Sequence, residues 1–191
     1  MLGTPIWPKK TRELHSHHFD STIWNDLKFR DDDIIVATYG KAGTTWMQQI
    51  IAQMLLGPDT ELSVAEMSPW LDLRVPPKAV KLPVVEAQAH RRFLKTHLPV
   101  DALVYSPRAK YLYIGRDARD VVWSMYNHHA NANSKWYEAL NDTPGRVGHQ
   151  SSRLLPIFDN IGSTGWSATV SLSGHSGKTR AVGGQFAIYR T

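Results

Sequence analysis

Runs of apolar residues separated by polar turns predict that strands alternate with helices along this chain. Apolar, β-branched runs predict strands at residues 34–39, 91–97 and 110–114. Helical spacing of apolar residues predicts helices at 44–56 and 116–129. The apolar positions of the first helix are Trp46, Ile50, Met54 and Leu55, and those of the second that we expect to face inward are Val121, Val122 and Met125. We therefore expect an α/β fold, a P-loop-like three-layer α/β/α arrangement around a central parallel sheet.

The segment between the first helix and the second strand is less regular. Residues 58–83 hold five prolines and no long period, so we interpret them as a loop with a short helix around residues 64–73. Within this segment, Trp70 is either a wall of an acceptor pocket or an ordinary core residue.

The composition is that of a globular protein of 191 residues, which suits one ordinary domain. A net charge of +5 favours an anionic ligand and gives only weak support for nucleic acid as a partner. The absence of cysteine excludes disulfides, thiolate metal sites and a cysteine nucleophile. Since the first residues do not resemble a signal peptide and the longest apolar stretch (47–56) is too short for a bilayer, we expect a cytoplasmic protein without a membrane partner.

The strongest chemical signal is TYGKAGTTW, the turn between the first strand and the helix that follows it. A glycine-containing turn that leads into a helix presents backbone N–H groups and the positive end of the helix dipole, which together bind phosphate. Lys41 adds a charge, and Thr44 and Thr45 add hydroxyl donors. Trp46 offers a flat face for a base. Because the lysine precedes Gly43, the turn is not a Walker A loop, and glycines that only permit a tight turn are the alternative interpretation.

Polar groups also follow the other two predicted strands, at the edge where open α/β sheets bind ligands. Arg116 follows the third strand and Ser124 lies about two helical turns further on, so one element offers a guanidinium and a hydroxyl to a second phosphate. An ion pair of Arg116 with Asp117 or Asp120 is the alternative. His97 follows the second strand and can accept a proton from a hydroxyl near neutral pH. A purely structural histidine is the alternative there.

Three motifs, KAGTTW, KTHLP and RDARDVVWSMYNH, resemble in this order the cytosolic-type sulfotransferases that use 3′-phosphoadenosine-5′-phosphosulfate (PAPS). The resemblance covers residues 20–148 and implies that Trp46 stacks on adenine. It implies that Arg116 and Ser124 hold the 3′-phosphate. It also implies that His97 is the general base and that Lys95 helps to hold the transferring group. The residues implied to bind the 5′-phosphosulfate are Lys41, Gly43, Thr44 and Thr45.

The sequence departs from the family pattern in the turn and at its C-terminal side. The family's first motif reads approximately YPKSGTTW, so Gly40 replaces a proline and Ala42 replaces a serine. Loss of the proline relaxes the turn, and loss of the serine removes a hydroxyl that restrains Lys41. The RxGxxGxW-type loop with which family members cover the 3′-phosphate is missing. We therefore expect the three-layer fold to be incomplete at its C-terminal side.

The end of the chain differs in composition from the rest. We divide the chain into residues 1–148, a PAPS-binding core, and residues 149–191, an atypical tail rich in Ser, Thr and Gly without a strand or helix period. Back-translation of residues 173–191 in a frame shifted by one base permits FWPFWENARSWWAIRDLP, which resembles an aromatic helical stretch of family members. We infer a frameshift between about residues 148 and 173. A flexible tail or a short glycine-rich hairpin is the simpler alternative.

The motifs together predict a sulfotransferase. It would move a sulfuryl group from PAPS to a hydroxyl or amine of a small-molecule acceptor, with 3′-phosphoadenosine 5′-phosphate (PAP) as product. We expect no metal, because Lys41, Lys95 and a helix N-terminus supply positive charge. Two alternatives stay open: a truncated, inactive relative that at most binds PAP, and a P-loop kinase-like phosphotransferase. The sequence predicts neither the acceptor nor the oligomeric state.

Overall fold

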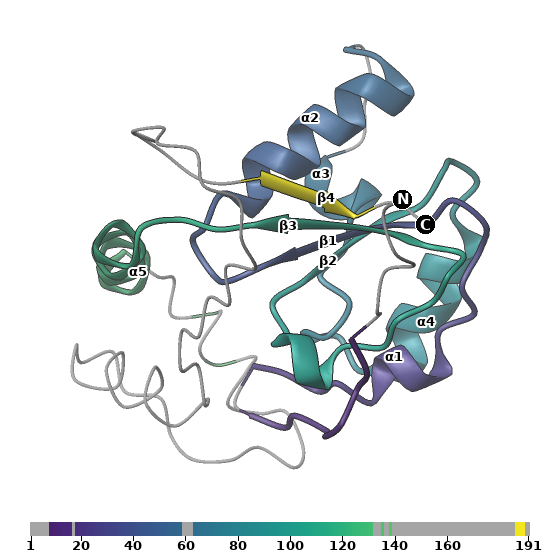
Figure 1. Cartoon of the computed structure of the whole chain (residues 1–191), viewed down its shortest axis with the longest axis horizontal. Helices are drawn as coiled ribbons and strands as arrows, with labels where there is room; N and C mark the ends of the chain where they lie inside the picture. The colour runs from purple at the N-terminus through teal and green to yellow at the C-terminus, as the bar shows by residue number, and fades with distance from the viewer. Residues whose placement is uncertain are drawn as a thin grey trace, which may run out of the picture.

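A sheet with strand order β2-β1-β3-β4 forms the centre of the described part of the chain (Figure 1). The computed structural model describes residues 8–16, 18–58, 63–131, 135, 138 and 186–189. β1 pairs in parallel with β2 and with β3, whereas β4 pairs antiparallel with β3. The three parallel strands therefore end at one edge of the sheet. The strands are β1 (Ile34–Thr38), β2 (Phe93–Thr96), β3 (Lys110–Ile114) and β4 (Phe186–Tyr189).

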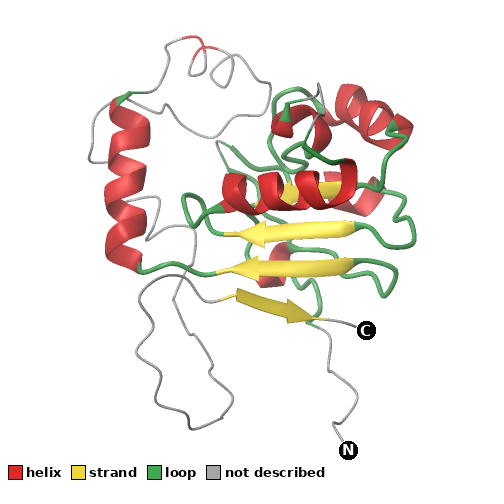
Figure 2. Cartoon of the chain, turned by 90° about the horizontal axis from the view of Figure 1, so that it is seen from above, coloured by secondary structure: helices red, strands yellow, loops and turns green. Residues whose placement is uncertain are grey.

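Helices cover both faces of this sheet, as Figures 1 and 2 show. α2 (Thr44–Leu56) and α3 (Val64–Met67) lie on one face, and α1 (Ile23–Asp26) and α4 (Lys78–Ala87) lie on the other. The 3₁₀ helix η1 (Val100–Ala102) follows β2. α5 (Ala118–Ala130) lies beyond the carboxyl end of β3 and runs crosswise to the strands (Figure 2). This arrangement confirms the predicted α/β class and its parallel central sheet.

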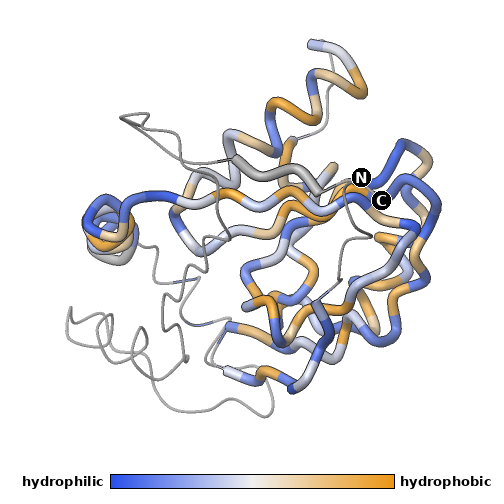
Figure 3. Tube along the Cα trace, viewed as in Figure 1, coloured by the Kyte–Doolittle hydropathy of each residue, from blue (hydrophilic) through white to orange (hydrophobic). Residues whose placement is uncertain are grey.

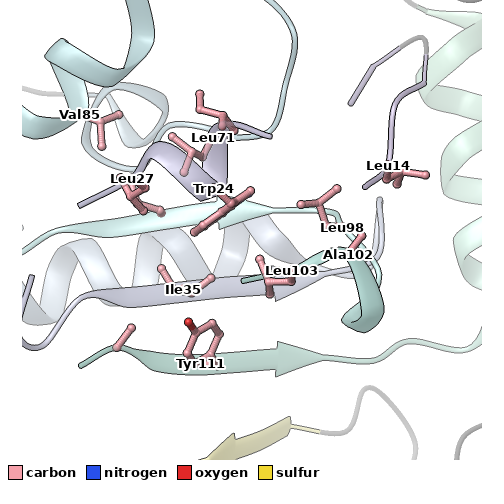
Figure 4. Packing of buried hydrophobic residues seen from close by; sticks show 13 residues of the cluster. Leu14, Trp24, Leu27, Ile35, Leu71, Val85, Leu98, Ala102, Leu103 and Tyr111 are labelled. Carbon is pink, nitrogen blue, oxygen red and sulfur yellow. The ribbon is translucent and has the colours of Figure 1, made fainter. Parts of the chain in front are cut away.

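The strands supply two apolar cores because successive side chains of a strand point to opposite faces. Ile35 packs in a cluster with Trp24 of α1 and Val85 of α4 (Figure 4). Its neighbour Val36 packs on the other face with Ile51 of α2. Figure 3 shows the hydrophobic residues following the strands, and hydrophilic residues in the connection from β3 to α5. Both helix layers are therefore fixed by one set of alternating strand residues.

The helix predicted after the first strand is confirmed as α2, but its apolar period does not mark the face that meets the core. Trp46 and Met54 are each 79% exposed, and Ile50 is 47% exposed. The buried face includes Gln48, whose side-chain amide donates to the carbonyl and hydroxyl oxygens of Ser68 at 2.7 and 2.9 Å. Hydrogen bonding of a buried amide thus makes a polar residue part of the inner face.

The interpretation of residues 58–83 as mostly loop is wrong for α4. This helix of 10 residues contains Pro83, which removes one intrahelical hydrogen bond. A proline inside a helix costs about 3 kcal/mol, so the sequence pattern argued against a helix. Burial of Val85, together with the hydrogen bonds from the Lys81 ammonium to the carbonyl oxygens of Trp70 and Leu71, offsets that cost. Tertiary packing therefore decides the structure of this segment.

The tail is described at β4 alone. Phe186 pairs with Ile114, and Tyr189 pairs with Tyr111, in an antiparallel register. The structure has a strand here although we expected no strand period in the tail. Its sequence, FAIY, is a run of four apolar residues, which is too short to show a period. The division between residues 148 and 149 and the remaining predictions for the tail lie outside the described residues.

Candidate active site

Three segments meet at the carboxyl edge of the parallel strands: the turn after β1, the residues after β2 and the connection from β3 to α5 (Figure 2). Ligands bind at this edge in open α/β sheets. The turn at residues 40–43, His97 and Arg116 all lie here, because each directly follows a parallel strand. The structure thus brings together the groups that the sequence singled out at three distant positions.

The turn after β1 exposes backbone N–H groups. Lys41 and Gly43 have positive φ angles of 64° and 112°. The first helical hydrogen bond of α2 runs from the Met47 amide to the Gly43 carbonyl at 3.2 Å. The amides of residues 44–46 precede this bond and have no acceptor within the helix. Together with the helix dipole, these amides attract an anion.

Helix α5 packs against the same turn through Met125. A Cβ atom added to Gly40 would lie 3.1 Å from the Met125 Cε. At this departure from the family's proline, a side chain would thus meet the flexible end of Met125. The next departure, Ala42, is a buried side chain. The turn is therefore held between α5 and the sheet.

The two threonines at the start of α2 point in different directions. The Thr44 hydroxyl is buried and hydrogen-bonded to the Thr38 hydroxyl at the end of β1. Thr45 and Trp46 are exposed. The Thr44 side chain is thus engaged with the end of β1, whereas the Thr45 side chain is exposed.

His97 is buried and held by the same strand end. Its Nδ1 lies 2.7 Å from the Thr38 carbonyl oxygen. A carbonyl can only accept, so Nδ1 carries the proton and the lone pair is on Nε2. Burial lowers the pKa of His97 to about 3, and the charge of Lys95 adds to the effect, whereas the bond to Thr38 opposes it. The imidazole is therefore neutral near pH 7, as a general base must be.

Lys95 of β2 lies between aromatic and cationic neighbours. Its Nζ lies 4.8 Å from the centre of the Trp70 ring. Burial lowers the pKa of Lys95; the charge of Lys41 adds to this, and that of Asp72 opposes it. The positive charges of these two predicted active-site lysines therefore act on each other, and a nearby anion would relieve their repulsion.

Arg116 reaches back over the turn. Its Nη1 donates to the Lys41 carbonyl at 3.0 Å, and its Nε lies 3.8 Å from the nearer Asp120 carboxylate oxygen. Asp117 instead accepts from Arg119. Ser124, half-buried, lies further along α5. The guanidinium therefore contacts the turn more closely than it contacts the carboxylates at the start of α5.

Sequence reasoning missed Thr38 and Asp72 as parts of this site. Thr38 is a polar residue that ends an apolar strand, and this contrast was a usable signal. Asp72 lies in a proline-rich segment without a motif, yet it is fully buried beside Trp70 and His97. The sequence held no signal for Asp72.

Within the described residues, no three His, Cys, Asp or Glu side chains are grouped closely enough to hold a metal ion. None of the helices in the described part has the length and apolar character needed to cross a membrane.

Comparison with known proteins identifies the family. The model of the sulfotransferase domain matches residues 31–160. The chain is 37% identical over 144 residues to a glycolipid sulfotransferase of Mycobacterium tuberculosis, an alignment that covers 75% of this chain and 43% of that protein. It is 37% identical over 122 residues to human sulfotransferase 2B1, covering 60% and 32% of the two chains. A crystal structure of a mouse sulfotransferase complexed with PAP aligns with 73% of this chain and 44% of that chain, at a TM-score of 0.46 and 20% identity.

The chain belongs to the sulfotransferase domain family. This confirms the family that the three motifs indicated. The chain spans less than half the length of the mycobacterial relative that it matches.

Proposed function

We propose that this chain binds PAPS and transfers its sulfuryl group to a hydroxyl or amine of a small-molecule acceptor. One observation carries the proposal: an anion-binding turn and a neutral, oriented His97 share the residue Thr38 at the end of β1. A sulfuryl donor needs the first feature, and a hydroxyl acceptor needs the second. The family membership is consistent with both.

The donor would lie across the turn. The amides of Gly43 to Trp46 and the Lys41 ammonium would hold the 5′-phosphosulfate, with the Thr45 hydroxyl as a further donor. The exposed Trp46 ring offers its face to adenine. Arg116 and Ser124, which follow β3, would take the 3′-phosphate that distinguishes PAPS from ATP. Each of these roles is a proposal for the residue named.

The acceptor would approach from the side of His97. Nε2 takes the hydroxyl proton as the acceptor oxygen bonds to sulfur, and the bond from sulfur to the phosphate oxygen breaks to leave PAP. Lys41 and Lys95 stabilise the negative charge on the transferring group and the leaving oxygen. The charge of the bound donor raises the pKa of His97 from its value in the free protein, which makes it a better base. Positioning and cationic stabilisation thus supply most of the rate.

A PAP-binding chain without turnover is the second candidate. The observation that favours it is the coverage: the matched segment is 43% of the mycobacterial relative. For the tail, we propose a frameshift between about residues 148 and 173, since a shifted frame of residues 173–191 permits a family-like aromatic stretch. Sequencing the gene tests this. A nucleotide sequence whose shifted frames encode nothing family-like would overturn it.

The experiment that tests the function has two parts. Thermal unfolding and calorimetry with PAP, with ADP as control, test the two phosphate sites; ligand at a hundred times its Kd adds about 2.7 kcal/mol to the free energy of unfolding. Transfer from sulfur-labelled PAPS to naphthol tests the chemistry. Binding of PAP over ADP with transfer supports the enzyme, and binding without transfer supports the second candidate. Equal binding of PAP and ADP contradicts both.

A further inference from the structure

Asp72 is a fully buried carboxylate at the candidate active site that no motif covers. One oxygen, Oδ2, accepts from the Trp70 indole Nε1 at 2.9 Å and from the His97 backbone amide at 3.4 Å. The other, Oδ1, accepts from the Trp24 indole Nε1 at 3.2 Å. One oxygen thus faces the site and the other faces the core around α1.

Trp70 is the residue through which Asp72 meets the reactive groups. Its ring lies edge-on against the His97 imidazole, with ring centres 4.7 Å apart. The Lys95 ammonium lies over the same ring at 4.8 Å. A single indole therefore touches both the proposed base and the proposed sulfuryl-binding lysine. Its rotation would displace both of them.

The backbone around Trp70 is fixed independently of the carboxylate. Lys95 bonds the segment on both sides, accepting from the Leu71 amide at 3.0 Å and donating its own amide to the Pro69 carbonyl at 3.1 Å. Lys81 of α4 also holds this segment, because its Nζ donates to the carbonyl oxygens of Trp70 and Leu71. With the backbone held, the remaining freedom of Trp70 is in its side-chain torsions. The indole N–H bond to Asp72 restricts that freedom.

We propose that Asp72 is a positioning residue for sulfuryl transfer: its carboxylate fixes the Trp70 indole, and the indole fixes His97 and Lys95 relative to each other. The inference rests on the proposed function for its catalytic consequence. Asp72 itself touches neither donor nor acceptor in this account. Because small misplacements of catalytic groups cost up to about 100-fold in rate, the indole's orientation has a measurable effect.

The two indoles bonded to one carboxylate provide a matched pair of variants. Trp70→Phe and Trp24→Phe each remove one N–H donor from Asp72 and keep an aromatic ring. Asp72→Asn removes the charge, and Asp72→Asn combined with Trp70→Phe completes a double-mutant cycle. The measurements are the kcat for transfer from PAPS to naphthol, the Kd for PAP, the Tm, and the NMR resonances of the His97 ring, whose shifts respond to the adjacent indole.

We expect Asp72→Asn and Trp70→Phe each to lower kcat about 10-fold to 100-fold and to leave the Kd for PAP within about twofold. The double variant should lose no more than the worse single variant, because both changes release the same indole. Trp24→Phe should lower the Tm and leave kcat and the His97 resonances in place. Fully additive losses, or a loss of kcat in Trp24→Phe as large as that in Trp70→Phe, would overturn the inference.

The inference stays testable if the wild-type chain is inactive or if one variant does not fold. If the wild-type chain transfers nothing, the proposed function fails, and the resonances decide the inference separately. A shift of the His97 ring signals in Trp70→Phe and Asp72→Asn but not in Trp24→Phe supports it, and unchanged signals refute it. If Asp72→Asn does not fold, the comparison of Trp70→Phe with Trp24→Phe gives the same decision.

Discussion

His97 and Thr38 are joined across the ends of two neighbouring strands, with the imidazole Nδ1 2.7 Å from the carbonyl oxygen. The Thr38 side chain also bonds to Thr44, the first residue of α2. One residue of β1 therefore connects the proposed base with the anion-binding turn. Since the acceptor is a backbone atom at the end of a parallel strand, this bond holds Nδ1, while the Trp70 ring also contacts the imidazole.

Removing the imidazole should abolish turnover without removing the donor site. We expect His97→Ala to lower kcat by about 10²-fold to 10⁴-fold, the range typical of general-base catalysis. The affinity for PAP should change little, because the amides of the turn do not depend on the imidazole. Calorimetry with PAP and transfer assays at saturating PAPS measure the two effects. His90→Ala, a change at a half-buried histidine before β2, is the control, and a His97→Ala protein with the wild-type rate would contradict the proposed base.

Burial of neutral His97 should make the fold less stable in acid. The pKa of His97 is lowered from 6.5 to about 3 in the folded protein. Below about pH 6.5 the unfolded chain binds a proton that the folded protein does not, so the free energy of unfolding falls as the pH drops towards 3. The full effect approaches about 5 kcal/mol. Urea unfolding of the wild type and of His97→Gln from pH 7 to pH 4 measures it. The variant should show the flatter dependence, and parallel curves would argue against burial of the neutral ring.

The two glycines of the turn should differ in their sensitivity to alanine. Gly43 has a φ of 112°, so we expect Gly43→Ala to cost about 1–3 kcal/mol of strain and to weaken PAP binding by reorienting the turn amides. At Gly40 the new methyl group meets only the flexible end of Met125, at 3.1 Å. Gly40→Ala should therefore cost less than about 1 kcal/mol. Urea unfolding and PAP calorimetry on both variants test this contrast, and equal losses at the two positions would refute it.

Sequence patterns predicted the parts of the molecule whose structure depends on residues that are close together in the chain. β1 and β3 are apolar runs ended by polar turns, and the chemical groups that follow them lie at the strand ends by necessity of the parallel topology. The contacts of Asp72 could not be predicted, because its partners Trp24 and His97 are 48 and 25 residues away. Helix α4 was missed because Pro83 opposes it locally and buried contacts of Lys81 favour it. The inner face of α2 was missed for a similar reason. Gln48 is part of this face because it hydrogen-bonds to Ser68, and a pattern of apolar residues cannot indicate such a contact.

Arg116 should distinguish PAP from ADP. Its Nη1 bonds to the Lys41 carbonyl and its Nε lies 3.8 Å from Asp120, so a 3′-phosphate bound beside the turn can recruit it without breaking a close ion pair. A charge-assisted hydrogen bond contributes about 1.5–3 kcal/mol, so we expect Arg116→Ala to weaken PAP binding at least 10-fold. ADP lacks the 3′-phosphate, so its affinity should change little in this variant. Calorimetry with both nucleotides at low and high salt measures the difference, and the salt dependence for PAP should decrease in the variant.

Arg119 provides the matched control for this prediction. It stands three residues further along, its side chain is 91% exposed, and it bonds to Asp117 at 3.1 Å, so its charge is solvated and already paired. Arg119→Ala removes the same charge from the same end of α5 and should leave the affinity for both nucleotides within about twofold. If both arginine variants weaken PAP equally, the effect is general electrostatic attraction. If Arg116→Ala weakens PAP and ADP equally, the guanidinium supports the 5′ end of the nucleotide, and the assignment to the 3′-phosphate is wrong. Selective loss of PAP in Arg116→Ala alone would establish the second phosphate site, because only a group directed at the 3′-phosphate separates the two ligands.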